Sequence, residues 1–215
     1  MAIITIARQF GAGGETVGQI LAQRLAADLL DRAIMDEVAR RLQLPDEEIE
    51  AHDEHPGSLI GRLLTALGTA SVDVSAPPEV VAWTPPYADP AFDPRQAVLN
   101  ITQEVIREAA RTGNAVIVGR GGAYLLRDHP QALHAFLQAA MPVRIATVMR
   151  VLGVGEEQAR HRIRRTDTNR GAYIRQVYGH DWRHPSHYDL VLDTGRLGYE
   201  AAADALVAAL KGRTA

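Results

Sequence analysis

Residues 2–14 read Ala-Ile-Ile-Thr-Ile-Ala-Arg-Gln-Phe-Gly-Ala-Gly-Gly, and much of the fold can be inferred outward from them. Residues 2–7 are mostly apolar and rich in β-branched side chains, which is typical of a buried strand. The glycine-rich residues 8–14 follow at once. Beyond them, apolar side chains fall at helical spacing, at Val17, Ile20, Leu21 and Leu25. The start of the chain therefore predicts a strand, a glycine-rich loop and a helix in direct succession.

The alternation of strands and helices continues along the chain. Short apolar runs predict further strands at 29–31, 115–118, 133–137 and 190–192. Amphipathic stretches predict helices at 34–42, 59–67, 98–109, 143–151, 155–178 and 199–210. This order favours a parallel sheet that is covered by helices on both faces. Ligands of such sheets bind beyond the carboxyl ends of the strands, where two glycine-rich loops are expected, at 8–14 and 119–122.

The composition is that of one globular domain over residues 1–215. Hydrophobic residues make up 47% and charged residues 23% of the chain, which excludes disorder throughout. The formal net charge of −3 argues against a general nucleic-acid binder. There is no cysteine, which excludes disulfides and thiolate metal sites. Because no apolar run is long enough to span a membrane and the N-terminus lacks signal-peptide features, we expect a cytoplasmic protein without a membrane partner.

Two segments show no clear periodicity. Residues 69–94 hold six of the 11 prolines, which predicts a long surface loop because proline lacks the backbone donor. We expect Trp83 in this segment, like Trp182 later in the chain, to anchor a loop. The histidines His180, His184 and His187 have a spacing that a metal site can use, but the proline between them argues against a regular arrangement.

The first glycine-rich loop has some features of a phosphate-binding loop. Glycines permit close approach of the backbone, and the following helix N-terminus attracts anions. The full phosphate-loop pattern is G-x-x-x-x-G-K-[ST], and only Gly13 matches it. Gly14 stands at the lysine position and Glu15 at the hydroxyl position, with Thr16 next. A tight structural turn therefore remains an alternative for the loop.

Arginine is expected to do the work that lysine does in other phosphate sites, because Lys211 is the only lysine beside 22 arginines. Arg8 at the entry of the loop is the best substitute for the missing lysine, since a guanidinium can donate two hydrogen bonds to phosphate. An ion pair that serves only the structure is the alternative for Arg8. The predicted helix at 155–178 is rich in arginine. Within it we expect Arg170 and one of Arg164 and Arg165 to close over phosphates.

Several motifs, taken in order along the chain, resemble the cytidylate kinase-like family. Residues 4–18 resemble the start of that family, whose loop has the form R-Q-[FY]-G-[SA]-G-G without the lysine. The run Val-Ile-Val-Gly-Arg-Gly at 116–121 resembles a strand end of the family, and Tyr-Asp-Leu-Val-Leu-Asp-Thr at 188–194 resembles its last strand. Shorter matches are Leu30-Asp31, His52-Asp53-Glu54 and Asp167-x-x-Arg170.

The resemblance implies a nucleoside-monophosphate-kinase fold, a P-loop α/β/α domain with a five-stranded parallel sheet. It implies an acceptor-side insertion at about 32–96, a lid at about 153–187, and ATP and Mg²⁺ as cofactors. Residues expected to bind the donor are Gly11, Ala12, Gly13, Gly14, Glu15 and Thr16, with the Thr16 hydroxyl on the metal side. Residues expected to contact the acceptor are Asp31, Arg120 and Asp167.

The resemblance favours a kinase that phosphorylates a small acceptor, with a nucleoside monophosphate such as CMP as the first candidate. True cytidylate kinases read G-R-D where this chain has Gly119-Arg120-Gly121, so the specificity for cytidine is open. Two other classes stay open as well. One is a nucleotide-binding regulator without transfer activity, and the other is a dinucleotide-binding enzyme that uses Gly11, Gly13 and Asp31. We expect small-molecule nucleotides as ligands and allow for a homodimer.

Overall fold

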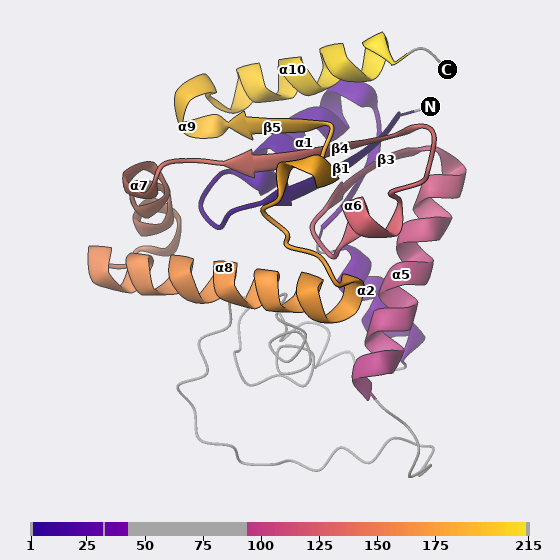
Figure 1. Cartoon of the computed structure of the whole chain (residues 1–215), viewed down its shortest axis with the longest axis horizontal. Helices are drawn as coiled ribbons and strands as arrows, with labels where there is room; N and C mark the ends of the chain where they lie inside the picture. The colour runs from indigo at the N-terminus through magenta and orange to yellow at the C-terminus, as the bar shows by residue number, and fades with distance from the viewer. Residues whose placement is uncertain (1, 32, 43–93, 214–215) are drawn as a thin grey trace.

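The computed structural model describes residues 2–31, 33–42 and 94–213. The predicted helix at 59–67, most of the proline-rich segment with Trp83, and the His52-Asp53-Glu54 motif lie outside these residues. In the described part, five parallel strands form one sheet in the order β2-β3-β1-β4-β5 (Figure 1). The strands are β1 (Ala2–Arg8), β2 (Asp28–Leu30), β3 (Asn114–Val118), β4 (Ala132–Gln138) and β5 (Leu190–Asp193).

The described helices confirm the predicted ones to within a few residues, except for the long helix that begins at Pro94 rather than near Val98. They are α1 (Gly14–Leu25), α2 (Ala33–Arg41), α5 (Pro94–Thr112), α6 (Gly122–Leu125), α7 (Met141–Leu152), α8 (Glu156–Tyr178), α9 (Thr194–Leu197) and α10 (Tyr199–Gly212). The sequence did not predict α6 and α9. Each has only four residues, too few to show a helical period. Among the described helices, none is long and apolar enough to cross a membrane.

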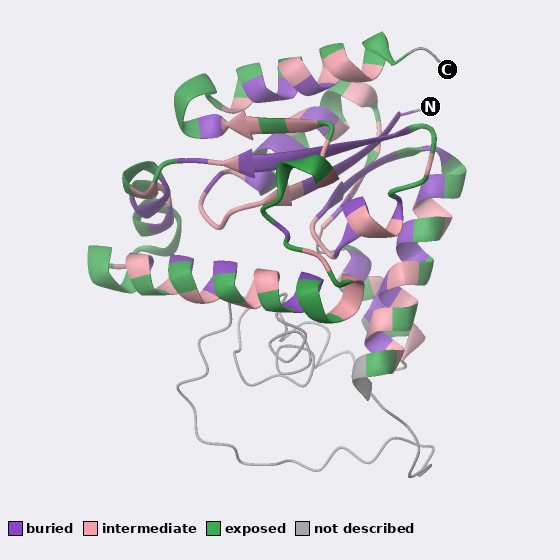
Figure 2. Ribbon diagram, in the orientation of Figure 1, coloured by how far each residue is buried: buried purple, intermediate pink, exposed green. Residues whose placement is uncertain are grey.

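Both faces of the three central strands, β1, β3 and β4, are buried, as expected for parallel strands, whereas the edge strand β5 is partly exposed (Figure 2). Alternate side chains of β1 point to opposite faces. Ile4 and Ile6 join the core beneath α1 and α10, where Leu21 and Leu206 are also fully buried. Ile3 lies on the other face, in the core beneath α2 and α5. The sheet is therefore the middle of three layers.

The strand order separates this fold from a dinucleotide-binding fold. Here β1 lies between β3 and β4. In a dinucleotide-binding sheet, the order 3-2-1-4-5-6 makes β1 and β2 neighbours. The fold therefore does not support the dinucleotide-binding alternative.

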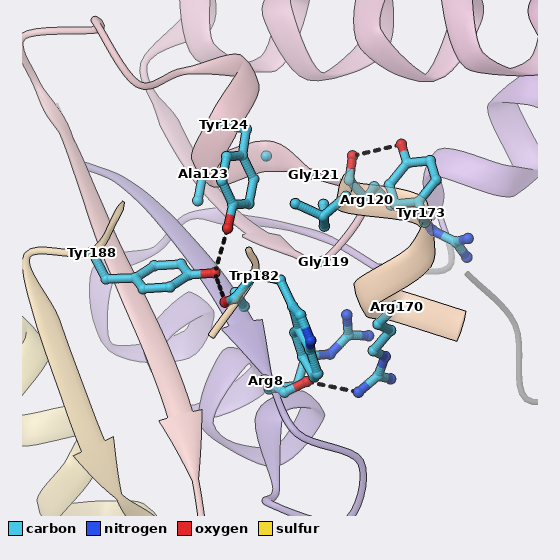
Figure 3. A pocket seen from close by; sticks show the side chains of 13 residues that line it. Arg8, Gly119, Arg120, Gly121, Ala123, Tyr124, Arg170, Tyr173, Trp182 and Tyr188 are labelled. Atoms are coloured by element: carbon cyan, nitrogen blue, oxygen red, sulfur yellow. Dashed lines mark hydrogen bonds between the residues drawn. The ribbon is translucent and has the colours of Figure 1, made fainter. Parts of the chain in front are cut away.

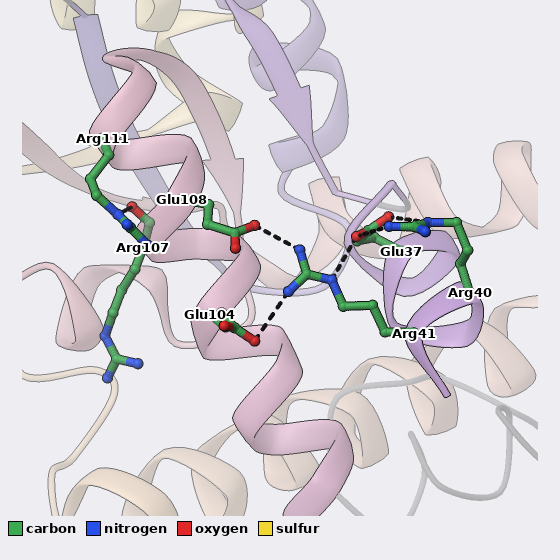
Figure 4. Close-up of polar contacts among 7 residues, drawn as sticks. All are labelled: Glu37, Arg40, Arg41, Glu104, Arg107, Glu108 and Arg111. Atoms are coloured by element: carbon green, nitrogen blue, oxygen red, sulfur yellow. Dashed lines mark hydrogen bonds and ion pairs between the residues drawn. The ribbon is translucent and has the colours of Figure 1, made fainter. Parts of the chain in front are cut away.

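Helices α2 and α5 are joined across their exposed sides by a group of ion pairs (Figure 4). Arg41 of α2 contacts Glu104 at 3.1 Å and Glu108 at 2.7 Å, both on α5. The same guanidinium and that of Arg40 donate to Glu37. These hydrogen bonds, first Arg40 and then Arg41, lower the pKa of Glu37 to about 2. These ion pairs hold α2 and α5 together, the helices that come before and after residues 43–93 in the sequence.

Candidate functional site

The loop after β1 needs glycine at two positions. Gly11 and Gly13 have φ values of +81° and +75°, which side chains with a Cβ rarely adopt. A Cβ on Gly11 would lie 2.9 Å from the carbonyl oxygen of Arg144, and one on Gly13 would overlap the ring of Tyr199. The loop is therefore held against α7 on one side and against the start of α10 on the other.

The carbonyl groups of this loop are hydrogen-bonded to the body of the protein. Arg170 donates to the oxygen of Arg8, Arg144 to that of Phe10 and Thr194 to that of Ala12, each at 2.8 Å. The first N–H groups of α1 have no acceptor within the helix, and no side chain caps them at Gly13. Backbone donors without acceptors, at the positive end of a helix of 12 residues, are suited to an anion.

The side chain of Arg8 fills the space that a side chain at position 14 would need. A Cβ on Gly14 would lie 2.5 Å from Cγ of Arg8. The guanidinium continues past the loop to Gly119, where it also leaves no room for a Cβ. Its Nη2 lies 3.7 Å from Asp31 at the end of β2. Arg8 thus lies where a phosphate-loop lysine would begin, but it extends toward the second loop.

The loop after β3 has three successive residues with positive φ, namely Gly119, Arg120 and Gly121 at +80°, +53° and +73°. Arginine in this conformation costs on the order of 1–3 kcal/mol, and such residues are concentrated at functional sites. A Cβ on Gly121 would overlap the ring of Tyr178, which comes from the end of α8. No aspartate side chain can therefore follow Arg120 unless Tyr178 moves.

A pocket beside the second loop, which we call the aromatic pocket, contains four aromatic rings among its lining residues (Figure 3). It is lined by Ala7, Arg8, residues 119–124, Arg170, Tyr173, Ile174, Trp182 and Tyr188. The hydroxyl groups of its three tyrosines, Tyr124, Tyr173 and Tyr188, form hydrogen bonds with other groups of the protein. Those of Tyr124 and Tyr188 lie 3.1 Å apart, and Tyr188 also donates to the carbonyl oxygen of Trp182 at 2.6 Å. Tyr173 donates to the carbonyl oxygen of Arg120 at 3.4 Å. Trp182 is buried between α8 and Phe136, as expected for a loop anchor.

Three largely buried arginines meet at this pocket, and they carry more positive charge than the nearby carboxylates balance. Burial lowers the pKa of Arg8, Arg120 and Arg170, and the charge of Arg8 lowers the other two further. For Arg120 the pKa falls to about 10. Within the described part of the chain, the buried Nη1 of Arg120 and Nε of Arg170 have no hydrogen-bond partner. Unpaired buried donors of this kind favour the binding of an anion.

A second depression, which we call the loop cleft, lies on the other side of Arg8 and Arg170. It is lined by the first glycine-rich loop, the start of α1, the end of α7 and Tyr199. Arg8 and Arg170 line both the loop cleft and the aromatic pocket. The two depressions therefore meet at a pair of guanidinium groups.

Most of the residues predicted to bind a donor do line the loop cleft: Gly11, Gly13, Gly14, Glu15 and Thr16. Glu15 is exposed, so its carboxylate can point away from a bound anion. Ala12 does not line the cleft, because it is buried and its N–H donates to the oxygen of Gln9 at 3.2 Å. Asp31, predicted on the acceptor side, lines the loop cleft instead of the aromatic pocket.

The predicted arginines of α8 divide into two groups. Arg170 lies between the two depressions, whereas Arg164 and Arg165 line neither. They are about 120° and 140° around the helix from Arg170, at 3.6 residues per turn. Arg162 and Arg150 line the loop cleft instead. The period of the helix could have shown that Arg162 lies nearer to the face of Arg170, but the position of Arg150 on α7 had no signal in the sequence.

Asp167 was predicted to contact the acceptor, but it does not line the aromatic pocket. It is 4% exposed. One oxygen accepts from the N–H of Phe10 at 2.9 Å, and the other from Arg144 at 2.5 Å. Because both carboxylate oxygens bind groups of the protein, the geometry favours a structural role.

The residues present are compatible with Mg²⁺ bound to a nucleotide. Such an ion usually keeps several waters and takes one or two protein ligands beside the phosphates. The Thr16 hydroxyl and the Asp31 carboxylate both line the loop cleft. In the described ranges no group of three or more His, Cys, Asp or Glu side chains forms a metal site. His180 and His187 instead pack together, 4.6 Å between ring centres, beside Tyr124.

Comparison with known proteins places these features in a family. The model of the cytidylate kinase-like family matches residues 3–196. The cytidylate kinase of Methanopyrus kandleri is 33% identical over 112 residues, which are 48% of this chain. The match spans 58% of that protein, little more than half of its length.

Two solved structures share the fold. An uncharacterized protein from Eubacterium ventriosum superposes with a TM-score of 0.70 at 21% identity, over 99% of this chain and all of that one. Shikimate kinase from Bacteroides thetaiotaomicron superposes with a TM-score of 0.54 at 14% identity, over 98% of each chain. The predicted fold class, a P-loop α/β domain with a five-stranded parallel sheet of the nucleoside-monophosphate-kinase type, is thereby confirmed.

Proposed function

This chain belongs to the cytidylate kinase-like family, and on that premise we propose that it transfers the γ-phosphoryl group of MgATP to a small phosphorylated acceptor. A nucleoside monophosphate is the proposed acceptor class, with CMP as the first candidate. The nucleotides are the proposed partners, and the ATP phosphates occupy the loop cleft. The acceptor phosphate occupies the aromatic pocket.

The observation that carries the proposal is the shared position of Arg8 and Arg170, which line both depressions. Phosphoryl transfer brings a donor and an acceptor into line and spreads negative charge between them. Positive charge is needed most at the point where the two sites meet. The two guanidinium groups lie at that point and are largely buried, which strengthens their interaction with charge.

In the proposed reaction, an oxygen of the acceptor phosphate attacks the γ-phosphorus as the bond to the bridging oxygen of ADP breaks. Backbone N–H groups of Gly11 and of residues 13–16, which line the loop cleft, bind the β- and γ-phosphates. Arg8 replaces the lysine that is absent at Gly14, and Arg120 holds the acceptor phosphate. Mg²⁺, when bound with ATP, neutralises part of the phosphate charge.

A nucleotide-binding regulator without transfer activity is the second candidate. Two observations favour it. Arg8 is paired with Asp31 at 3.7 Å, and this pairing reduces its charge toward a phosphate. The ring of Tyr178 lies against Gly121, where the related kinases have an aspartate. This candidate predicts nucleotide binding without formation of ADP.

The test is ADP formation from MgATP across a panel of nucleoside monophosphates, together with calorimetric titration of MgATP alone. Turnover with one acceptor is the expected result. Binding of MgATP without turnover on any acceptor would favour the regulator. A protein that binds no MgATP would overturn both candidates.

A further inference from the structure

We propose that Arg144 and Asp167 are positioning residues that hold the glycine-rich loop in the conformation that binds the donor phosphates. This inference rests on the proposed function only in taking ATP as the donor. Neither residue lines the loop cleft or the aromatic pocket. Their hydrogen bonds therefore reach the donor through the loop, whereas the charge of Asp167 also acts on Arg170. Arg144→Lys keeps both charges of the pair and so tests the loop contacts alone.

Arg144 and Asp167 each form a hydrogen bond with the backbone of Phe10, a residue of the glycine-rich loop. The guanidinium of Arg144 and the carboxylate of Asp167 form an ion pair at 2.5 Å. Their side chains are only 4% and 5% exposed. Asp167 accepts from the N–H of Phe10 at 2.9 Å, while Nε of Arg144 donates to its carbonyl oxygen at 2.8 Å. The pair therefore fixes the direction of the peptide groups on both sides of Phe10.

The direction of these peptide groups matters because it decides which backbone atoms face a bound anion. A phosphate is attracted by N–H groups and repelled by carbonyl oxygens. The hydrogen bond from Arg144 turns the carbonyl of Phe10 toward α7. Gly11, the next residue, packs against the backbone of Arg144 itself. Without the pair, the loop loses the contact that withdraws the carbonyl of Phe10 from the cleft and the contact that holds the N–H of Phe10.

The opposite charges of Arg144 and Asp167 favour an effect on the donor through loop geometry and not through a net charge. Arg144 and Asp167 neutralise one another at 2.5 Å, so they add little net field at the donor. A third group, Arg183, reaches Asp167 at 3.4 Å, with its guanidinium over the ring of Trp182. Since Arg183 is more than half exposed, it contributes little to the pair.

A buried ion pair can also serve stability alone, because removing one partner leaves an uncompensated charge. The test must therefore separate folding from binding. Arg144→Lys keeps the positive charge beside Asp167, but an ammonium cannot hold the guanidinium geometry that reaches both Asp167 and the carbonyl of Phe10. Asp167→Asn keeps an acceptor for the N–H of Phe10 and removes the charge.

The experiment measures the Kd for MgATP by calorimetry, the KM for donor and acceptor, and the thermal midpoint. For Arg144→Lys we expect a Kd for MgATP raised about tenfold, with the acceptor KM within twofold of the wild type. We expect Asp167→Asn to raise the Kd similarly and to lower the thermal midpoint more. The matched controls, Glu156→Gln and Arg160→Met, break an exposed pair at 2.7 Å on α8, the helix of Asp167, and should leave the Kd unchanged.

The outcomes separate this inference from the proposed function. If folded Arg144→Lys and Asp167→Asn bind MgATP as tightly as the wild type, the positioning role is wrong and the pair serves stability alone. An equal rise in donor Kd and acceptor KM would also overturn the inference, because it would indicate a general loosening. If the wild type binds neither MgATP nor inorganic tripolyphosphate, the proposed function fails and the inference fails with it.

Discussion

The loops after β1 and β3 have the same plan, a strand followed by a glycine-rich turn and a helix, but they differ in the groups that they present. After β1, side chains of α7, α8 and α9 donate hydrogen bonds to the loop carbonyls. The loop leads into the N-terminus of α1, a helix of 12 residues. After β3, the helix has only four residues. There the turn places one side chain, Arg120, in a strained conformation at a pocket of aromatic rings.

This difference indicates that one architecture can make an anion site in two ways. The first loop offers backbone N–H groups, which act through their number and their fixed direction. The second offers a buried guanidinium, whose charge acts because water is excluded. Arg8 and Arg170 belong to both sites. Substitutions can therefore test what the loops share and what distinguishes them.

Arg170→Met should have the largest effect, because it removes one of the two charges that the sites share and also the hydrogen bond to the carbonyl of Arg8. We expect kcat/KM to fall about a hundredfold or more for the donor and for the acceptor alike. Steady-state kinetics with each substrate varied in turn would measure this. Arg160→Met is the control on the same helix, and a loss confined to one substrate would contradict a shared role.

Arg120→Ala should distinguish the loops, because Arg120 lines the aromatic pocket and not the loop cleft. We expect kcat/KM for the acceptor to fall about thirtyfold to a hundredfold, while the Kd for MgATP stays within twofold. Turnover of the acceptor at the wild-type rate would show that the acceptor phosphate binds elsewhere.

Gly14→Lys restores the lysine of the usual phosphate loop, and we nevertheless expect it to weaken binding. Its Cβ would lie 2.5 Å from Cγ of Arg8, so one of the two side chains must move. The Kd for MgATP should rise about tenfold. The double variant Arg8→Ala/Gly14→Lys should recover part of this loss, and calorimetry on both single variants and the double variant would complete the cycle. A single Gly14→Lys variant that binds more tightly than the wild type would contradict this account.

The smallest effect is expected from His134, which lies on β4 outside both loops and whose Nδ1 is 2.7 Å from the Thr5 hydroxyl. Burial lowers the pKa of His134, although Asp189 opposes the shift and Arg213 adds to it. In the unfolded chain the imidazole gains a proton below about pH 6.5, whereas in the folded protein it does so only at lower pH. The free energy of unfolding should therefore fall as the pH drops below about 6.5.

Urea unfolding of the wild type and of His134→Asn at several pH values would measure this contribution. We expect a flatter pH dependence in the variant and an unchanged Kd for MgATP in both proteins at neutral pH. An identical pH dependence in the two proteins would show that His134 does not contribute.

The layers of the fold and the location of the site could be predicted from local patterns. Alternating apolar runs and helical spacing predicted each described strand and every described helix longer than four residues. The glycines at 11, 13, 119 and 121 marked the two turns, and all four have positive φ in the structure. These features depend on residues that are near one another in the chain, so a short window of sequence contains the information.

The contacts within the site could not be predicted in the same way. Nothing near Gly121 in the sequence indicates that Tyr178 covers it, and nothing near Phe10 indicates that Arg144 and Asp167 hold its backbone. The resemblance to the family implied a contact between Asp167 and the acceptor, whereas in the structure its carboxylate holds Phe10 and Arg144. These partners are separated by 57 residues or more in the chain. They meet because the crossover connections of a parallel sheet bring the ends of distant strands and helices to one edge, and the packing there decides which side chain reaches which atom.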